Sequence, residues 1–424
     1  MKQLNRISIL SLAMAVLFGS LVSGGCGNSG GEGSSSGSVT TGDGGTTGKR
    51  PAPPGDGVTA SGDTIKIGLV ASMTGDNKPW GEDSYEGAKI AVAEYNAAGG
   101  FEGKQVELLM QDSASKPDQA KLATEKLLSD GVIAIVGEVS SGNTIQIAKS
   151  AFPKAVPVVA IGATRTDLTD EGGHVFRVCY TDDVQGPVMA KFAYDKLALR
   201  KVAVMTDTNL PYSQGLSASF IAKFKELGGE IIHEANYSST EPPQYSGQLT
   251  ELKAKQPDGL FLSGYFTEVG PIAQQARAAG ITVPLLGGDG WDSPTILTSG
   301  GDAIIGGYFA NHYNNADNRP QVTEFLKKWK AAHKGKIPNT TMGALGYDAM
   351  ALTLDALTRA KVANSKKIIE ALDNTEGFAG VSGDITLKGY NGNPPKRVIV
   401  VEIVKGGPAD FQKFAIDYTP DQLK

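Results

Sequence analysis

Residues 64–72 are TIKIGLVAS, and this stretch decides the fold class of the chain. It is a short, nearly continuous apolar run, which is typical of a strand buried on both faces. An amphipathic helix is expected next, over residues 82–97, and the two glycines that follow should end it. Further strands are expected at 106–111, 132–136 and 156–161, and further helices at 118–128 and 144–152. Strands and helices that alternate in this way predict a parallel sheet wrapped by helices.

The same alternation restarts near Pro187. After a helix up to residue 199, strands are expected at 202–206, 230–237, 259–262 and 283–286, with helices at 214–227, 247–255 and 269–279. Two copies of one architecture favour two similar lobes over one large sheet. The predicted fold class is therefore α/β, with two similar doubly wound lobes and mainly parallel sheets.

Length and composition are those of a packed globular protein. The chain has 424 residues, which suits two domains, and 40% of them are hydrophobic and 20% charged. A net charge of −5 gives no reason to expect a nucleic-acid partner. Apart from Cys26 the chain contains only Cys179, so we expect no internal disulfide in the mature protein, and the core must hold the fold together.

The N-terminus has the features of an export signal. Basic residues precede an apolar run over residues 7–22, and two glycines stand directly before Cys26. This pattern predicts a lipoprotein signal peptide over residues 1–26, with Cys26 acylated. The alternative is a soluble exported protein that is cut nearby and loses Cys26. Because the run is shorter than the roughly 20 residues of a spanning helix, we expect a lipid-anchored protein at a bacterial membrane, periplasmic or at the cell surface.

Residues 27–62 are mostly glycine, serine and threonine, with several prolines near the end. Such a segment has too little apolar surface to order itself. We therefore expect a flexible tether between the anchor and the folded body, stiffer at its prolines.

Ligand sites of parallel α/β sheets lie at the carboxyl ends of the strands. The first candidate loop there is GEVSSGNT, residues 137–144. It offers hydroxyls and free backbone N–H groups at the start of a helix, an arrangement that suits a carboxylate. Simple N-capping of that helix by Ser141 or Asn143 would explain the same residues.

Two further strand-end loops carry complementary groups. In residues 161–164, the hydroxyl of Thr164 can donate to an anion or accept from an ammonium group, and the carbonyl of Gly162 can accept as well. In GGDGW, residues 287–291, the carboxylate of Asp289 can receive an amine, and a zwitterionic ligand would supply the partner that a buried charge needs. Ordinary turns, including an Asx-turn at Asp289, remain the alternative.

Aromatic residues are expected near the same strand ends and helix starts, where their rings can cover an ammonium group or line an apolar pocket. Each of them alone could be ordinary packing. They are Trp80, Tyr212, Tyr265, Trp291 and Tyr347.

No catalytic machinery is expected. The four histidines lack metal-ligand spacing, and Cys179 lies in a predicted strand over residues 174–180, where it is interpreted as a core residue. The sequence contains no GxSxG nucleophile elbow and no phosphate-binding GxxxxGK[ST] loop. We therefore predict a protein that is not an enzyme and needs no cofactor or metal.

From about residue 65 onward the chain resembles periplasmic (type I) solute-binding proteins of the Leu/Ile/Val-binding family, the substrate receptors of branched-chain amino-acid ABC transporters. The order and spacing of several segments carry this resemblance. They are IGLVASMTG at 67–75, the 137–144 loop, GATRTDLT at 162–169, DDVQGP at 182–187, QQARAAG at 274–280 and GYDA at 346–349.

The resemblance implies an architecture and a function. Three hinge crossings, near residues 180–183, 311–314 and 381–390, would join lobe one (63–181 plus 313–389) to lobe two (183–311 plus 390–424). The protein would be the extracytoplasmic, monomeric receptor of an ABC importer, closing its lobes on an amino acid and delivering it to permease subunits. A ligand-sensing module for another small zwitterion or amide is the alternative; an exported enzyme is disfavoured because no nucleophile–base pair is visible.

The resemblance also implies roles for single residues. Ser141 and Thr164 would bind the carboxylate of the ligand, and the Gly162 carbonyl, Thr164 and Asp289 would hold its ammonium group. The expected ligand-binding set is completed by Trp80, Val139, Ser140, Ala163, Tyr212, Tyr265, Trp291 and Tyr347.

The chain departs from the family at three places. Asp289 stands where the family has glutamate, which moves the carboxylate back by about 1.5 Å, one carbon–carbon bond. Trp80 replaces a tyrosine, which puts strict Leu/Ile/Val specificity in question. The small disulfide of the family maps to Ser115 and Ser140, so this chain lacks it.

Overall fold

The computed structural model describes residues 50–406, 411–419 and 422. The predicted signal peptide, Cys26 and the tether as far as residue 49 lie outside the described residues. Among the helices that are described, none combines the length and the apolar character needed to cross a membrane.

Residues 50–62, which the sequence places in the tether, are packed against lobe one. Val58 N donates to Ser365 Oγ at 2.8 Å, and Ala60 N donates to Ala363 O at 2.8 Å. The Arg50 guanidinium donates to Val175 O at 2.6 Å. The expectation of a flexible tether is therefore wrong for this part of the chain, because its backbone and its arginine find partners on the folded body.

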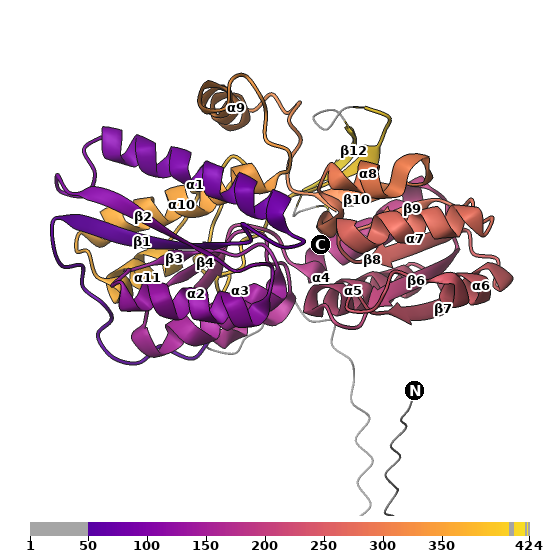
Figure 1. Ribbon diagram of the computed structural model, residues 1–424, viewed down its shortest axis with the longest axis horizontal. Coiled ribbons are helices and arrows are strands. Elements are labelled where there is room, and N and C mark those ends of the chain that lie inside the picture. Colours follow the sequence, from indigo (N-terminus) through magenta and orange to yellow (C-terminus); the bar gives the residue numbers. More distant parts are fainter. Residues whose placement is uncertain (1–49, 407–410, 420–421, 423–424) are drawn as a thin grey trace, which may run out of the picture. The chain divides into compact units, whose positions relative to one another are not determined.

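Lobe one is built on a parallel sheet with the strand order β2-β1-β3-β4-β5. Its strands are β1 Thr64–Ala71, β2 Gln105–Asp112, β3 Ile135–Val136, β4 Val158–Ala160 and β5 Val175–Arg177. Its helices are α1 Lys78–Ala97, α2 Pro117–Ser129, α3 Ser141–Ala151, α9 Pro320–Ala332, α10 Met342–Ala360 and α11 Ser365–Asp373. All of the strands end at one edge, so the loops that follow them meet there (Figure 1).

Lobe two is built on a sheet with the order β12-β11-β10-β9-β8-β6-β7. Its strands are β6 Lys201–Asp207, β7 Glu230–Tyr237, β8 Gly259–Ser263, β9 Leu285–Gly287, β10 Tyr308–Asn311, β11 Val398–Ile403 and β12 Gln412–Tyr418. Its helices are α4 Asp182–Lys191, α5 Pro211–Glu226, α6 Ser246–Ala254, α7 Phe266–Ala278 and α8 Thr295–Gly300. Pairing is parallel except at β11, which lies antiparallel to both β10 and β12.

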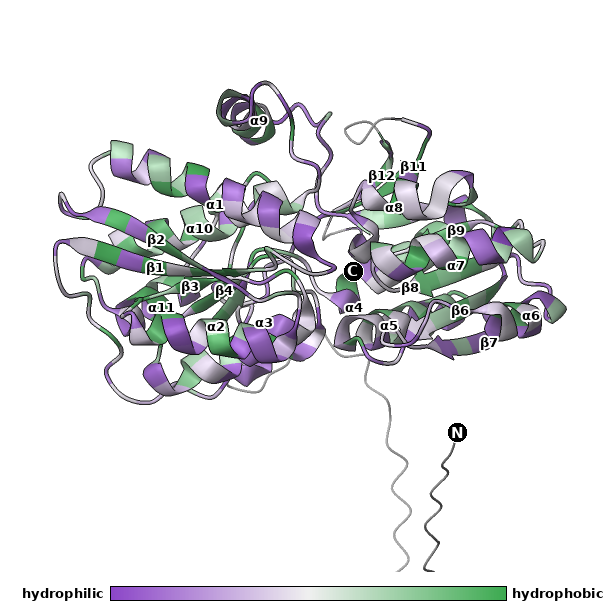
Figure 2. Ribbon diagram, in the orientation of Figure 1, coloured by the Kyte–Doolittle hydropathy of each residue, from purple (hydrophilic) through white to green (hydrophobic). Residues whose placement is uncertain are grey.

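Helices cover both faces of the first sheet because the apolar side chains of β1 alternate. Leu69 packs in one cluster with residues of α1 and α10, whereas Val70 packs in another with residues of α2 and α3. Figure 2 shows the matching hydropathy: β3 and β4 are mostly hydrophobic, and α2 and α3 combine hydrophobic with hydrophilic residues. The α/β class with two lobes and mainly parallel sheets is confirmed.

The boundaries of helix α1 and strand β5 differ from the predicted ones. Helix α1 begins at Lys78, four residues before the expected start, because Pro79 occupies its first turn, where a missing N–H costs nothing. Strand β5 ends at Arg177, so Cys179 lies beyond it. The chain passes between the two sheets after β5, after β10 and before β11.

Candidate functional site

A small cavity lies where loops from the two lobes meet. Val139 and Ser141 follow β3, Gly162 follows β4, and Asp289 follows β9, so carboxyl ends of strands supply it as expected. Its lining consists of Trp80, Val139, Ser141, Gly162 and Met342 from lobe one, and Tyr212, Tyr265, Asp289 and Gly290 from lobe two.

Ser141 is the first residue of α3 and lines the cavity. The helix has no side-chain cap, so simple N-capping is not what these residues do. The backbone N–H of Arg165 donates to Ser141 Oγ at 3.2 Å, which turns the hydroxyl toward the neighbouring strand-end loop. A serine hydroxyl can both accept and donate, so Ser141 can still donate to an anion in the cavity.

Glu138, a buried carboxylate that was not predicted at the site, shapes the loop around Ser141. Its Oε1 accepts from the hydroxyls of Ser72 and Ser113, the second at 2.6 Å. Its Oε2 accepts from the hydroxyl of Ser140 at 2.8 Å and from Ser140 N at 3.0 Å. The hydroxyl of Ser140 is therefore engaged inside the loop and does not line the cavity, contrary to the prediction.

A buried arginine, Arg177, donates hydrogen bonds to the backbone carbonyls of the loop after β4. Arg177 Nη1 donates to Ala163 O at 2.8 Å, and Nη2 donates to Arg165 O at 2.9 Å. The carbonyl of Ala163 also accepts from Cys179 Sγ at 3.4 Å. Burial raises the pKa of the Cys179 thiol to about 12, as suits a core residue rather than a nucleophile.

Within this loop only Gly162 reaches the cavity wall. A Cβ on Gly162 would lie 2.9 Å from Val139 Cγ1 and 3.0 Å from Met342 Sδ, so glycine keeps the space open. Thr164 is buried behind it, with its hydroxyl beside the carboxyl group of Asp182. Ala163 and Thr164 are thus next to the cavity rather than part of its lining.

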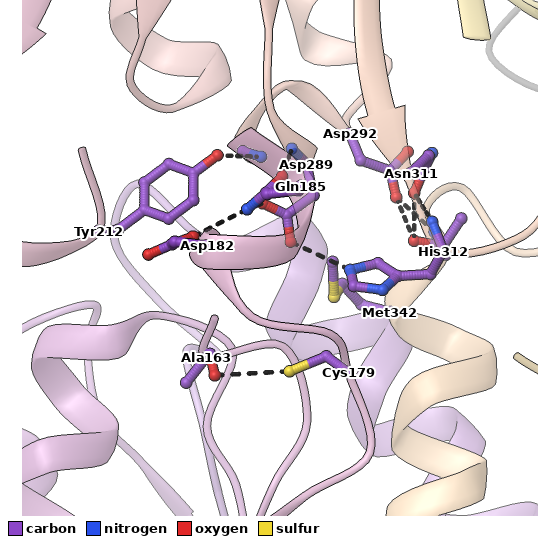
Figure 3. A network of polar contacts seen from close by, with 12 residues as sticks. Ala163, Cys179, Asp182, Gln185, Tyr212, Asp289, Asp292, Asn311, His312 and Met342 are labelled. Atoms are coloured by element: carbon purple, nitrogen blue, oxygen red, sulfur yellow. Dashed lines mark hydrogen bonds and ion pairs between the residues drawn. The ribbon is translucent and has the colours of Figure 1, made fainter. Parts of the chain in front are cut away.

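Asp289 is buried, and both of its carboxylate oxygens have side-chain partners (Figure 3). Gln185 Nε2 donates to Oδ1 at 3.0 Å, and His312 Nε2 lies 3.0 Å from Oδ2. The backbone N–H of Asp289 donates to Gln185 Oε1 at 3.1 Å. Neither Gln185 nor His312 was predicted at the site. Nothing in the local sequence connects them to Asp289, because they lie 104 and 23 positions away.

The aromatic wall forms as expected at three of the five predicted rings. Tyr212 stacks on Tyr265 with ring centroids 5.2 Å apart, and Trp80 meets Tyr265 edge-on at 5.0 Å. The Tyr212 hydroxyl accepts from Gly290 N at 3.0 Å. Burial raises the pKa values of Tyr212 and Tyr265 well above their ordinary range, so both remain neutral hydrogen-bonding groups.

The other two predicted rings lie elsewhere. Tyr347 packs on Phe325 at 5.4 Å, and its hydroxyl donates to Glu94 Oε2 at 2.7 Å. Trp291 is fully buried in the core of lobe two, where its Nε1 donates to Leu262 O at 3.1 Å. The place expected for Tyr347 on the cavity wall is taken by Met342, because Met342 is the first residue of α10 and Tyr347 lies farther along that helix.

Hydrogen bonds join the lobes beside the cavity. Trp80 Nε1 donates to Asp292 O at 2.7 Å. The Asp292 carboxylate accepts from Thr341 N at 2.6 Å and from Thr341 Oγ1 at 2.7 Å. Asp292 of lobe two therefore meets the first backbone N–H groups leading into α10 of lobe one, which stabilises a closed arrangement of the lobes.

Among the described residues, no group of three or more histidine, cysteine, aspartate or glutamate side chains is arranged to hold a metal ion. What the site offers instead is a small space with hydroxyl and N–H groups on one side, a carboxylate on the other and rings between them.

Comparisons with known proteins agree with this geometry. Residues 64–408 match the family described as periplasmic binding protein. The Leu/Ile/Val-binding protein homolog 3 of Brucella melitensis is 30% identical over 326 residues, 76% of this chain and 86% of that protein.

Two solved structures share the fold over most of the chain. The leucine binding protein of Thermotoga maritima is 35% identical with a TM-score of 0.79, and the match covers 84% of this chain and 99% of that one. The branched-chain amino acid transporter substrate binding protein of Streptococcus pneumoniae, in complex with isoleucine, is 29% identical with a TM-score of 0.76 over the same shares.

Proposed function

This chain belongs to the periplasmic binding protein family, and from that premise we propose that it is the extracytoplasmic receptor of an ABC importer for a branched-chain amino acid. Relatives named for leucine, isoleucine and valine binding support this ligand class. The structure in complex with isoleucine supports it as well.

The observation that carries the proposal is the chemistry of the cavity. Ser141 and the N-terminus of α3 lie on one side, and the carboxylate of Asp289 lies on the other. An α-amino acid presents a carboxylate and an ammonium group close together, so it matches both sides at once.

In this proposal, different lining residues bind different parts of the ligand. Ser141 and backbone N–H groups take the carboxylate, while Asp289 and the Gly162 carbonyl hold the ammonium group. Trp80, Val139, Tyr212, Tyr265 and Met342 surround the aliphatic side chain with apolar surface.

The mechanism is capture without chemistry. Contacts from both lobes to one ligand favour the closed state, and permease subunits in the membrane distinguish that state from the open one. The hydrogen bonds of Asp292 to Thr341 form only when the lobes meet, so they add to closure without touching the ligand.

We propose in addition that acylation at Cys26 anchors a monomeric receptor to the membrane. Labelling of cells with a radioactive or clickable fatty acid tests the anchor. The wild-type protein should take up the label and fractionate with membranes, and a Cys26→Ala variant should do neither. An unlabelled wild-type protein in the soluble fraction would contradict the anchor without affecting the ligand site.

A thermal-shift panel of L-leucine, L-isoleucine, L-valine, L-phenylalanine and L-glutamine tests the ligand class. A ligand that binds only the folded state stabilises it by about 2.7 kcal/mol at a hundred times its dissociation constant. The aliphatic amino acids should raise the melting temperature most. 4-Methylpentanoate, which is leucine without its amine, should raise it little, because Asp289 would be left without its cationic partner. A panel in which no amino acid shifts the melting temperature would contradict the proposal.

A further inference from the structure

A second buried carboxylate, Asp182, lies beside Asp289 at the start of α4 (Figure 3). Gln185 Nε2 donates to Asp182 Oδ1 at 2.9 Å and to Asp289 Oδ1 at 3.0 Å. We propose that Asp182 and Asp289 form one acidic unit that holds a proton in the empty protein and releases it when the ammonium group of the ligand binds. This inference rests on the function proposed above.

The orientation of Gln185 follows from its three partners. Its Nε2 group has two N–H donors, and each faces a carboxylate oxygen. Its Oε1 accepts from Asp289 N at 3.1 Å. If the Gln185 amide were flipped, its oxygen would face the two carboxylates, and its NH₂ group would face the N–H donor of Asp289. Both contacts would be repulsive. The two acids therefore share one donor group and are coupled through it.

His312 contacts the other carboxylate oxygen of Asp289. Its Nε2 lies 3.0 Å from Asp289 Oδ2, and its ring stacks on Tyr180 at 4.1 Å. Because a carboxylate oxygen only accepts, Nε2 is the donor of this hydrogen bond. Its Nδ1 is buried and has no hydrogen-bond partner among the described residues.

Two arginines act on Asp182 through their charge without a hydrogen bond to it. Arg177 Nη1 and Nη2 are bound to the carbonyls of Ala163 and Arg165, and the Arg165 guanidinium donates to Asp167 Oδ2 at 2.7 Å. Thr164, Tyr212 and Tyr265 present neutral groups.

Two carboxylates buried this close together cannot both ionise cheaply. In agreement with the geometry, burial first and the charge of Asp289 second raise the pKa of Asp182 to about 8. At neutral pH the empty protein thus holds Asp182 as the protonated acid. The ligand enters as an ammonium ion and keeps its three protons. Its positive charge favours the ionised form of both acids, so the carboxyl proton of Asp182 leaves to solvent.

This exchange fixes the sign of the pH dependence. Below about pH 8 the empty site carries the extra proton, so lowering the pH by one unit weakens binding by up to about tenfold, one proton per ligand. Above about pH 8 the unit is already ionised in the empty protein, and affinity should level off with pH.

Calorimetry of the full chain with L-leucine at pH 7, in phosphate and in Tris, measures the proton directly. The two buffers differ in ionisation enthalpy, so the observed binding enthalpy should differ by the amount expected for release of nearly one proton. The Asp182→Asn variant should bind with the same enthalpy in both buffers and with a flat pH profile. The control is Asp83→Asn, which changes a buried acid with a raised pKa of about 7 that does not line the cavity; it should release the proton as the wild type does.

The possible results separate a failure of the proton release from a failure of the proposed function. Tight binding of L-leucine with equal enthalpies in both buffers overturns the proton release and leaves the proposed function intact. Proton release that persists in Asp182→Asn also overturns the assignment, because the proton would come from another group. If no amino acid binds, the proposed function fails and this inference fails with it. Should Asp182→Asn not fold, the buffer and pH dependence of the wild type still decide.

Discussion

The two sides of the cavity are built in different ways. On the lobe-one side, one oxygen of Glu138 binds Ser140 two positions away, while the other is held by Ser72 and Ser113 from more distant strand ends. On the lobe-two side, both partners of the Asp289 carboxylate, Gln185 and His312, come from distant parts of the chain. The first side therefore combines a local contact at a helix start with distant support, whereas the second is a constellation that exists only in the folded protein.

This difference has an energetic consequence. Hydroxyl and N–H groups that meet an anion are neutral dipoles, and they lose little when the cavity is empty. A buried carboxylate has to be stabilised at all times, whether or not a ligand is present. The hydrogen bonds of Asp289 to Gln185 and His312 do this, so lobe two carries the more costly half of the site.

Of the substitutions considered, removal of the Asp289 carboxylate should weaken ligand binding most. Asp289→Ala leaves the ammonium group of the ligand buried without a partner, which costs about 2–5 kcal/mol and weakens binding roughly 30-fold to more than 1,000-fold. Calorimetry with L-leucine measures the loss. Asp302→Ala, which changes an exposed acid of lobe two, is the control and should bind normally. Undiminished affinity of Asp289→Ala would remove Asp289 from the site.

Removal of the hydroxyl on the opposite side should cost less. Ser141→Ala deletes one hydrogen bond to a charged group, worth about 1.5–3 kcal/mol, while backbone donors remain, so affinity should fall roughly 10- to 150-fold. Ser150→Ala lies on the same helix α3 away from the cavity and serves as the control. If Ser141→Ala weakened binding more than Asp289→Ala, the proposed division between the lobes would be reversed.

The inter-lobe hydrogen bonds offer a test that leaves the cavity intact. Asp292→Ala removes the acceptor of Thr341 N and Oγ1 in the closed form only. A penalty of about 1–2 kcal/mol should weaken L-leucine binding roughly 5- to 30-fold and shift the apo protein toward the open form. Small-angle scattering and calorimetry check both effects.

The matched control for Asp292→Ala is Asp83→Ala. Asp83 accepts from Thr340 N and Oγ1, the equivalent pair of bonds one residue earlier, but within lobe one. It should lower the melting temperature with little effect on closure. Equal effects of the two variants on affinity would show that Asp292 acts through stability alone.

The smallest effect is expected at Tyr347. Tyr347→Phe removes hydrogen bonds to Glu94 and Lys328 on a half-exposed surface. Affinity should stay within about twofold and stability should change by no more than about 1 kcal/mol. Calorimetry and thermal unfolding measure both quantities. A large loss of affinity would show that Tyr347 contributes to ligand binding, contrary to its position in the structure.

The fold was predictable because it rests on local patterns. Apolar runs such as 64–72 and the glycines after helices mark elements wherever they pack, and their alternation indicates a parallel sheet. The strands β11 and β12 were not predicted, and the antiparallel pairing of β11 with β10 joins segments that lie far apart in the chain.

The site was predictable only in its strand-end loops. Ser141, Gly162 and Asp289 stand directly after strands, so the topology places them together. Met342 gave no such signal, because it starts a helix that follows a long irregular segment. The predictions for Tyr347 and Trp291 were wrong because a ring near a helix start can face either the cavity or the core. Tyr347 packs against Phe325, and Trp291 packs against Phe309.

Strand and helix periodicity are properties of neighbouring residues, so the sequence by itself determined the class of fold, the strand-end loops and a hydroxyl-bearing helix start. The partners of a buried charge are set by which distant segments the packed core brings within hydrogen-bond reach. Only the tertiary structure therefore decided that Asp289 meets Gln185, His312 and a second acid, and that Asp292 joins the lobes through Thr341.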